Sequence, residues 1–215
     1  MAKPAASLEP GRALDATLIE WGKDKTFYRV HHERFRGDAF NPTRRGNARF
    51  SPIYDPSGAV IPTLYAGSTL DCALMETVFH DVPYKPGFKR ISLSVLDGQV
   101  RSVITFKRNL QLIDLGTIAL HKLAIKRNQL IDTTKAHYPR TRRWAEALYK
   151  QVPKAQGLRW TSRQDDRGHA VLLFGSRIKP TDLDAEPEAA SLIEEGEVIL
   201  PVLDLALRLG VVLVD

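Results

Sequence analysis

The segment at residues 62–81, PTLYAGSTLDCALMETVFHD, joins a strand pattern directly to a helix pattern. A short apolar run ends near Tyr65. Ser68 is placed to accept from the first-turn amides of a helix, with Asp71 three residues later as the acidic half of a capping box. Pro83 is expected to end this helix, because proline cannot continue the hydrogen-bond pattern. The chain is therefore expected to turn from a sheet into a helix at this point.

Apolar residues recur at helical spacing within this segment and place Glu76 next to them. Cys72, Met75, Val78 and Phe79 are expected to face the core. Glu76 then lies at the edge of the apolar face. Taken alone it is an ordinary helix-edge carboxylate paired with a Lys or Arg, whereas a functional carboxylate gains electrostatic strength from a low local dielectric.

The rest of the chain mixes strand and helix patterns without a regular βαβ rhythm. Strands are predicted at residues 26–32, 88–96, 110–116 and 211–215, with two more inside 157–177 joined by a charged turn at 165–168. Helices are predicted at residues 117–132, 141–151 and 200–210, the last with Pro201 near its first turn. We therefore predict an α+β fold, with a mixed or antiparallel sheet core flanked by helices.

Three further segments are described only by their composition. Residues 1–20 are expected to be a loose start with room for a short helix. Residues 33–48 form a long polar loop rich in Gly and Arg, of the kind that covers a site or frays. The acidic segment at 182–197 is interpreted as a surface connection.

The length and cysteine content suit one domain in a reducing compartment. The chain has 215 residues, a mass of 24.1 kDa and 43% apolar residues, enough for a single domain spanning residues 1–215. Its single cysteine, Cys72, cannot form an internal disulfide, which indicates a cytoplasmic setting. The N-terminus lacks the apolar core of a signal peptide, and Asp204 and Arg208 interrupt the longest apolar stretch, so no membrane association is expected.

Charge and histidine content leave two other function classes to consider. The net charge of +6 favours an anionic partner or substrate, so a basic nucleic-acid-binding module is one alternative. No recognisable binding motif accompanies the charge, so direct nucleic-acid binding is not the favoured interpretation. His31, His32 and His80 lack a third ligand at suitable spacing, and no metal site is predicted.

Four ordered segments carry a resemblance to a known family. They are FYRV at 27–30, ARFSP at 48–52, TLYAGSTLDCALMET at 63–77 and GLRWTSRQ at 157–164. In this order they resemble the RES domain, named for an Arg, a Glu and a Ser and found as the toxin of bacterial RES–Xre toxin–antitoxin pairs. The motif-bearing region spans about residues 27–177. Many members have a Gly-Arg-Trp-Asn run where this chain has ARFSP, followed by a shorter gap to the Tyr.

The resemblance implies a fold similar to ADP-ribosyltransferases and an enzyme that cleaves the nicotinamide–ribose bond of NAD⁺. NAD⁺ is then a substrate, no cofactor is implied, and either water or inorganic phosphate is the acceptor. By motif match the catalytic residues are Arg49, Tyr65, Glu76 and Ser162, and Arg29 joins Arg49, Tyr65 and Ser162 in binding NAD⁺. An Xre-type antitoxin is the implied protein partner, and the loop at 33–48 is expected to act as a lid or to meet that antitoxin.

These residue types suit that reaction. A carboxylate at Glu76 stabilises the oxocarbenium-like transition state, and nicotinamide leaves as a neutral base that needs no general acid. The ring of Tyr65 can stack on the cationic nicotinamide, an attraction of about 0.5–2 kcal/mol. The planar forks of Arg29 and Arg49 suit pyrophosphate oxygens, and the Ser162 hydroxyl can bond to phosphate or to the carboxamide.

One alternative within the enzymes is ADP-ribosyl transfer to a protein. ADP-ribosyltransferases often carry a second acidic residue two positions before the catalytic Glu, where it orients the acceptor. Leu74 occupies that position in this chain. The sequence therefore favours small acceptors over proteins.

Overall fold

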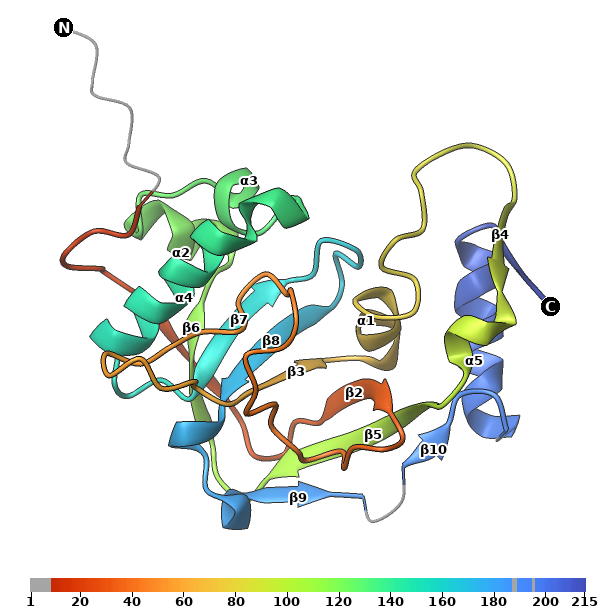
Figure 1. Cartoon of the computed structure of the whole chain (residues 1–215), viewed down its shortest axis with the longest axis horizontal. Coiled ribbons are helices and arrows are strands. Elements are labelled where there is room, and N and C mark those ends of the chain that lie inside the picture. Colours follow the sequence, from red (N-terminus) through yellow and green to blue (C-terminus); the bar gives the residue numbers. More distant parts are fainter. Residues whose placement is uncertain (1–8, 187–188, 195) are drawn as a thin grey trace, which may run out of the picture.

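The computed structural model describes residues 9–186, 189–194 and 196–215. Its centre is a sheet of nine strands in the order β1-β6-β7-β8-β3-β2-β5-β10, with β9 also pairing with β5 (Figure 1). Only β6 and β7 are parallel neighbours in this sheet. The sheet is therefore mixed and largely antiparallel, as predicted. The strands are β1 Leu18–Trp21, β2 Phe27–His32, β3 Thr63–Gly67, β5 Gln99–Phe106, β6 Leu110–Asp114, β7 Gly157–Thr161, β8 His169–Phe174, β9 Leu183–Ala185 and β10 Ala190–Ser191.

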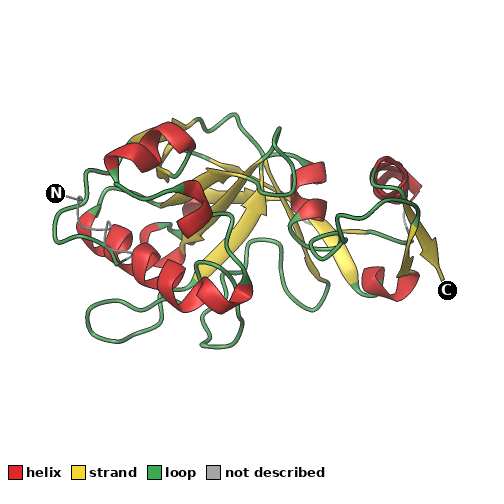
Figure 2. Ribbon diagram, turned by 90° about the horizontal axis from the view of Figure 1, so that it is seen from above, coloured by secondary structure: helices red, strands yellow, loops and turns green. Residues whose placement is uncertain are grey.

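The described part of the chain also contains a second, smaller sheet and five α-helices. In the small sheet β4 (Lys89–Ser92) and β11 (Val211–Val214) are parallel. The helices are α1 Leu70–Met75, α2 Thr117–Lys122, α3 Arg127–Leu130, α4 Tyr138–Gln151 and α5 Gly196–Arg208. Figures 1 and 2 show α2, α3 and α4 gathered at one end of the molecule, with α5 and the small sheet at the other.

Buried apolar residues form three clusters, and their arrangement fixes where a cleft can lie. One cluster joins β7 and β8 to α4 and includes Trp144, Leu158 and Trp160. A second joins α1, α5 and β2. The third lies on the opposite side of the strands and contains Phe27 and Leu64. Since the first two clusters share one side of the sheet, the surface between them is the natural position for a site.

The helix after β3 is shorter than predicted and begins one residue later. Thr69, not Ser68, is its N-cap, and the Thr69 side chain accepts from the amide of Cys72 at 3.1 Å. Ser68 instead accepts from the amide of His169 on β8 at 2.9 Å. The helix ends at Met75, because the Thr77 hydroxyl donates to the Ala73 carbonyl at 2.6 Å and the chain then turns. The prediction of a helix reaching Pro83 was therefore wrong.

The predicted helix at 117–132 is two helices, and the break has a local cause. The amide of Ala124 donates to the His121 carbonyl, and the amide of Ile125 donates to the Leu120 carbonyl. This pair of bonds is a Schellman motif, which requires a left-handed residue, and Ala124 has φ of 53°. Because an alanine occupies the position that glycine usually fills, the break carries no composition signal.

Several other predicted boundaries need correction. Residues 18–21 form a strand, not part of a loose start, while residues 1–8 lie outside the described residues. The strand predicted at 88–96 ends at Ser92 and continues as a 3₁₀ turn at Leu93–Leu96. Strand β5 was not predicted, and the acidic segment supplies β9 and β10, which pair with it. Helix α5 starts at Gly196, so Pro201 lies inside it.

Candidate active site

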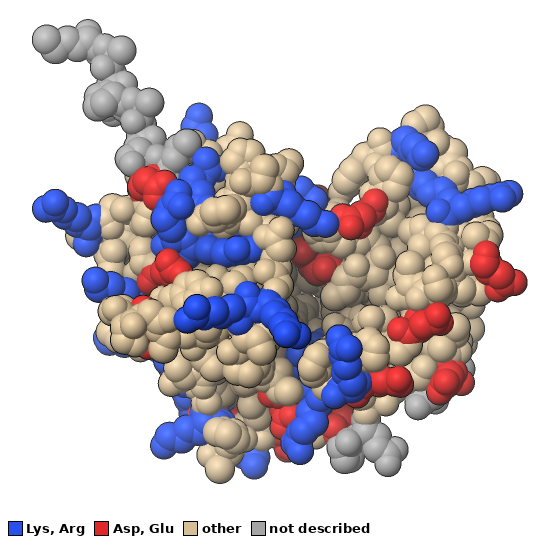
Figure 3. Space-filling model, in the orientation of Figure 1, with Lys and Arg blue, Asp and Glu red and all other residues tan. Residues whose placement is uncertain are grey.

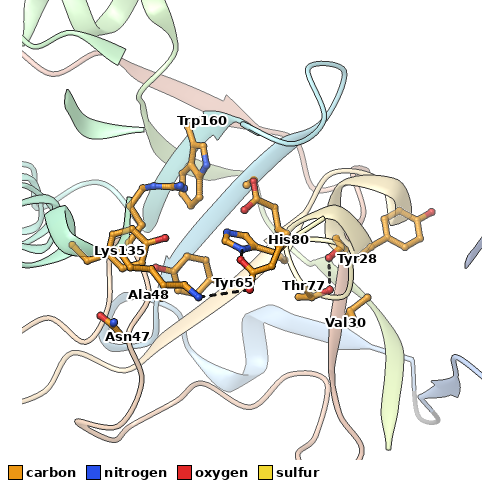
Figure 4. A pocket seen from close by; sticks show the side chains of 16 residues that line it. Tyr28, Val30, Asn47, Ala48, Tyr65, Thr77, His80, Lys135 and Trp160 are labelled. Carbon is orange, nitrogen blue, oxygen red and sulfur yellow. Dashed lines mark hydrogen bonds and ion pairs between the residues drawn. The ribbon is translucent and has the colours of Figure 1, made fainter. Parts of the chain in front are cut away.

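A pocket of about 380 Å³ lies between the two apolar clusters that share one side of the sheet. Figure 3 shows a hollow between two lobes, with acidic side chains inside it and on its rim. Figure 4 looks into the pocket, with Lys135 and Ala48 on one side and Tyr28 and Val30 on the other. The lining residues come from the sheet (Tyr28, Val30, Tyr65, Ala66, Trp160, Ala170), from α1 and the turn after it (Ala73, Glu76, Thr77, His80, Asp81), and from the segments before β3 and around α4 (Asn47, Ala48, Arg49, Lys135, Tyr138).

Glu76 is the carboxylate at the pocket wall, and a hydroxyl behind it fixes its position. It is the C-cap residue of α1, where its amide donates to the Cys72 carbonyl at 3.0 Å. Its Oε1 accepts from the Ser162 hydroxyl at 2.7 Å. The side chain is half-buried, so it is placed in a low-dielectric environment yet reaches the pocket. A carboxylate held in this way is preorganised to stabilise a positive charge in the pocket.

Ser162 belongs to the turn between β7 and β8, and its hydroxyl makes three hydrogen bonds. Its Oγ accepts from the amides of Gln164 at 3.0 Å and Asp165 at 3.1 Å while donating to Glu76. The residue is fully buried, with 0% exposed, and does not line the pocket. The Ser162 side chain therefore lies behind Glu76 and bonds to its carboxylate. The sequence had predicted that this hydroxyl contacts the substrate.

The turn carrying Ser162 approaches α1 closely because one of its residues is a glycine. A Cβ added to Gly168 would lie 2.5 Å from the Cβ of Cys72 on α1. No side chain fits in that space without moving the turn. Burial, followed by the neighbouring Glu76, raises the pKa of Cys72 to about 12, so this thiol is a packing residue of the interface.

Tyr65 and Arg49 form another wall, and each is held by its neighbours. The Tyr65 hydroxyl accepts from the amide of Phe50 at 2.9 Å, which ties β3 to the segment containing Arg49. Burial raises the pKa of Tyr65 to about 12, so the phenol keeps its proton. Arg49 is 5% exposed, and its guanidinium lies 5.8 Å from the ring centroid of Tyr138. The Thr141 hydroxyl donates to the Arg49 carbonyl and fixes the backbone there.

Arg29 is not brought to the pocket. Tyr28 and Val30 line the pocket, and successive strand residues point to opposite sides, so Arg29 faces away from it. One Arg29 nitrogen donates to the carbonyls of Gly37 at 2.7 Å and Ala39 at 2.8 Å. Burial lowers the pKa of Arg29 to about 10. Arg29 therefore anchors the predicted loop at 33–48, of which only Asn47 and Ala48 line the pocket.

This position predicts a structural effect for a change at Arg29. Arg29→Met is expected to lower the free energy of unfolding by about 2–3 kcal/mol, because the loop carbonyls lose a charged donor. We expect the folded variant to keep its KM for NAD⁺, the substrate that the family resemblance implies. Urea unfolding and steady-state kinetics measure both quantities, with Arg90→Met, at an exposed position of β4, as the matched control. Unchanged stability together with a tenfold higher KM would show that Arg29 binds the substrate.

Several residues that line the pocket were not predicted from the sequence. Tyr28 and Trp160 lie inside the family motifs, and their places on β2 and β7 follow from strand alternation once the strand faces are known. The ring of Trp160 stands edge-on to Tyr65, with 6.3 Å between centroids and an interplanar angle of 80°. Lys135 lies in the 3₁₀ turn before α4, and Tyr138 is the first residue of α4. No spacing rule links either residue to Glu76.

The rim of the pocket carries a chain of ionic contacts. Nδ1 of His80 lies 2.8 Å from Oδ1 of Asp81, and Nζ of Lys135 lies 3.7 Å from Oδ2 of the same carboxylate. The hydrogen bond from His80 is the largest cause that lowers the pKa of Asp81, and the charge of Lys135 adds to it. Since Asp81 and Lys135 are both mostly exposed, their contact contributes little to stability.

The described residues lack two features, a metal-binding cluster and a membrane-spanning helix. No group of three His, Cys, Asp or Glu side chains there is arranged to hold a metal ion. Within the same ranges, no helix combines the length and apolar character needed to cross a membrane.

Comparisons with known proteins agree with the fold and with the motifs. The family model described as RES domain matches residues 26–194. Among solved structures, a chain of the crystal structure of the M. tuberculosis MbcT–MbcA toxin–antitoxin complex is similar, with a TM-score of 0.56 and 15% sequence identity. That match covers 81% of this chain and 87% of the other. No curated protein sequence matches the chain.

Proposed function

This chain belongs to the RES domain family, and from that premise we propose that it is a toxin that degrades NAD⁺ in the cytoplasm and is neutralised by a cognate antitoxin. The reaction would break the nicotinamide–ribose bond and transfer the ADP-ribosyl group to water or inorganic phosphate. The observation that carries the proposal is the hydrogen bond that fixes Glu76 in a pocket shared with Arg49 and Tyr65.

The pocket suits the charge changes of this reaction. As the bond to nicotinamide breaks, positive charge develops on the ribose ring, and a fixed carboxylate at Glu76 stabilises it. The bond between the Tyr65 hydroxyl and the Phe50 amide holds the phenol ring in the wall, where it would stack on the nicotinamide ring. The buried guanidinium of Arg49 would bind the pyrophosphate, and its Nε has no protein partner within the described residues.

The antitoxin is proposed as a protein of the Xre type, on the strength of the family resemblance. The M. tuberculosis neighbour was solved as a toxin–antitoxin complex, which agrees with a protein partner of this kind. Because Arg29 ties residues 36–39 away from the pocket, an antitoxin segment at the pocket mouth would meet only the end of the 33–48 loop, at Asn47 and Ala48. The anchored part of that loop is poorly placed to be a lid.

Two alternatives receive less support from the structure. Transfer to a protein acceptor is disfavoured because Leu74, two positions before Glu76, is fully buried and cannot orient an acceptor. A nucleic-acid-binding module predicts a continuous basic surface, whereas basic and acidic side chains are interspersed on the face in Figure 3.

The proposed function is tested by incubating the purified chain with NAD⁺ and measuring nicotinamide release by chromatography. We expect release by the wild type and none above background with Glu76→Ala. Mass spectrometry of the second product distinguishes ADP-ribose from ADP-ribose 1″-phosphate. Mass spectrometry of cell extract incubated with the chain and NAD⁺ detects proteins that carry ADP-ribose. Equal release by both proteins, or none by the wild type, would refute the proposal. Tight, salt-sensitive binding to nucleic acid without turnover would favour the binding module.

A further inference from the structure

His80 lines the same pocket as Glu76, and the proposed function does not use it. Its Nδ1 lies 2.8 Å from Oδ1 of Asp81. A carboxylate at neutral pH only accepts hydrogen bonds, so the proton of the neutral imidazole is on Nδ1. Nε2 then carries a free lone pair, as in a histidine prepared to act as a base.

The turn between β7 and β8 positions both residues. Ser162 donates to the Glu76 carboxylate at 2.7 Å, and the side-chain nitrogen of Gln164 donates to the His80 carbonyl at 2.8 Å. Two residues of one turn therefore hold the Glu76 carboxylate and the backbone of His80 beside the same pocket. The side chain of His80 is 22% exposed, which leaves it accessible from the pocket.

The charges around His80 favour a neutral acceptor. Arg49 and Lys135 are balanced by Glu76 and Asp81, so the pocket has no net charge when His80 is neutral. Inorganic phosphate would add a net negative charge to this balanced pocket, whereas water adds none. Water, however, must lose a proton as it attacks, and phosphate need not.

The other titratable groups of the pocket are less suited to accept that proton. Three phenols face it, from Tyr28, Tyr65 and Tyr138, and a phenol must first be ionised to act as a base. Lys135 is a cation paired with Asp81. Glu76 is engaged by Ser162 and is required for the charge on the ribose. Among the described residues that line the pocket, His80 is the only imidazole.

We propose that His80 is the base that deprotonates the acceptor water and that Asp81 holds it in the required tautomer. This inference rests on the proposed NAD⁺ cleavage and assigns its acceptor. The bond between the anomeric carbon and nicotinamide breaks, and its electron pair leaves with nicotinamide. The water oxygen bonds to the same carbon, and its proton passes to Nε2 of His80 and then to solvent. The products are ADP-ribose, nicotinamide and a proton.

The first test compares His80→Gln with wild type and with His121→Gln, a change at an exposed histidine outside the pocket. Nicotinamide release is measured over about pH 5 to 8, where imidazoles titrate. For His80→Gln we expect an approximately 100-fold lower kcat at neutral pH. The wild-type rate is expected to fall on acidification, and the rate of His80→Gln is expected not to. Asp81→Asn, which leaves the His80 ring in place, is expected to lower kcat about tenfold.

A second test uses azide, an anion that attacks without losing a proton. Azide is expected to restore nicotinamide release in His80→Gln, with ADP-ribosyl azide as product, but not in Glu76→Ala. With phosphate present, the wild type is expected to yield ADP-ribose. Loss of activity in His80→Gln without azide rescue, an unchanged pH profile, or ADP-ribose 1″-phosphate as the main product would overturn the inference.

These outcomes separate the two proposals. A wild type that releases no nicotinamide defeats the proposed function. If the wild type releases nicotinamide and His80→Gln is equally active, only the role of His80 is refuted. If His80→Gln does not fold, as judged by circular dichroism, Asp81→Asn decides: full activity overturns the inference, and an approximately tenfold loss reversed by azide supports it.

Discussion

Glu76→Gln is expected to lower kcat for nicotinamide release by about 10³-fold, with a small change in KM. A neutral amide has nearly the shape of the carboxylate but cannot balance the charge that develops on the ribose, and removing one such electrostatic contact costs about 10²–10³ in rate. A 10³-fold loss corresponds to about 4 kcal/mol of transition-state stabilisation. Chromatographic initial rates over a range of NAD⁺ concentrations give both constants.

Stability separates the charge effect from a folding defect. Gln retains an acceptor oxygen for the Ser162 hydroxyl, which donates to Glu76 at 2.7 Å. The free energy of unfolding is therefore expected to stay within about 0.5 kcal/mol of wild type. Glu194→Gln, at an exposed carboxylate outside the pocket, serves as the control. Activity of Glu76→Gln within threefold of wild type would show that Glu76 does not stabilise the developing charge.

The sequence patterns located the fold class and most of the elements around the pocket, but not every strand. Strand β5 alternates buried and half-buried positions along its whole length, which is a clear strand signal. The buried alternate position at Ser102 is polar, however, and interrupts the apolar alternation. Its hydroxyl is satisfied by Nε2 of His31 at 2.8 Å, a partner on β2 that no local pattern reveals.

Some candidate site residues are positioned by elements that are local in sequence, and others by contacts between distant segments. Tyr65 and Glu76 are joined by one strand and one short helix, so their separation along the chain predicts that both line the pocket. Arg29 is adjacent to Tyr28, which does line the pocket, but a shift of one residue along a strand reverses the side it faces. Ser162 approaches Glu76 through a glycine contact between two distant segments, which spacing alone does not specify.

Ser162→Ala is expected to lower both stability and turnover. The Ser162 oxygen accepts from the amides of Gln164 and Asp165, and the residue is fully buried. Leaving two half-buried amides without an acceptor is expected to reduce the free energy of unfolding by about 2–4 kcal/mol. The Glu76 carboxylate also loses its donor, and a displacement of even 1 Å is expected to reduce kcat by about 10²-fold. Urea unfolding and kinetics measure the two effects, with the exposed Ser94→Ala as control.

The double variant Ser162→Ala/Glu76→Gln tests how Ser162 acts. If its hydroxyl works through the carboxylate, the loss of kcat from Ser162→Ala should shrink to less than about threefold in the Glu76→Gln background, because the two residues form one unit. The loss of stability should persist there, since the two amides still lack their acceptor. A raised KM for NAD⁺ with unchanged kcat in the single variant would instead place the hydroxyl on the substrate, as the family motif had suggested.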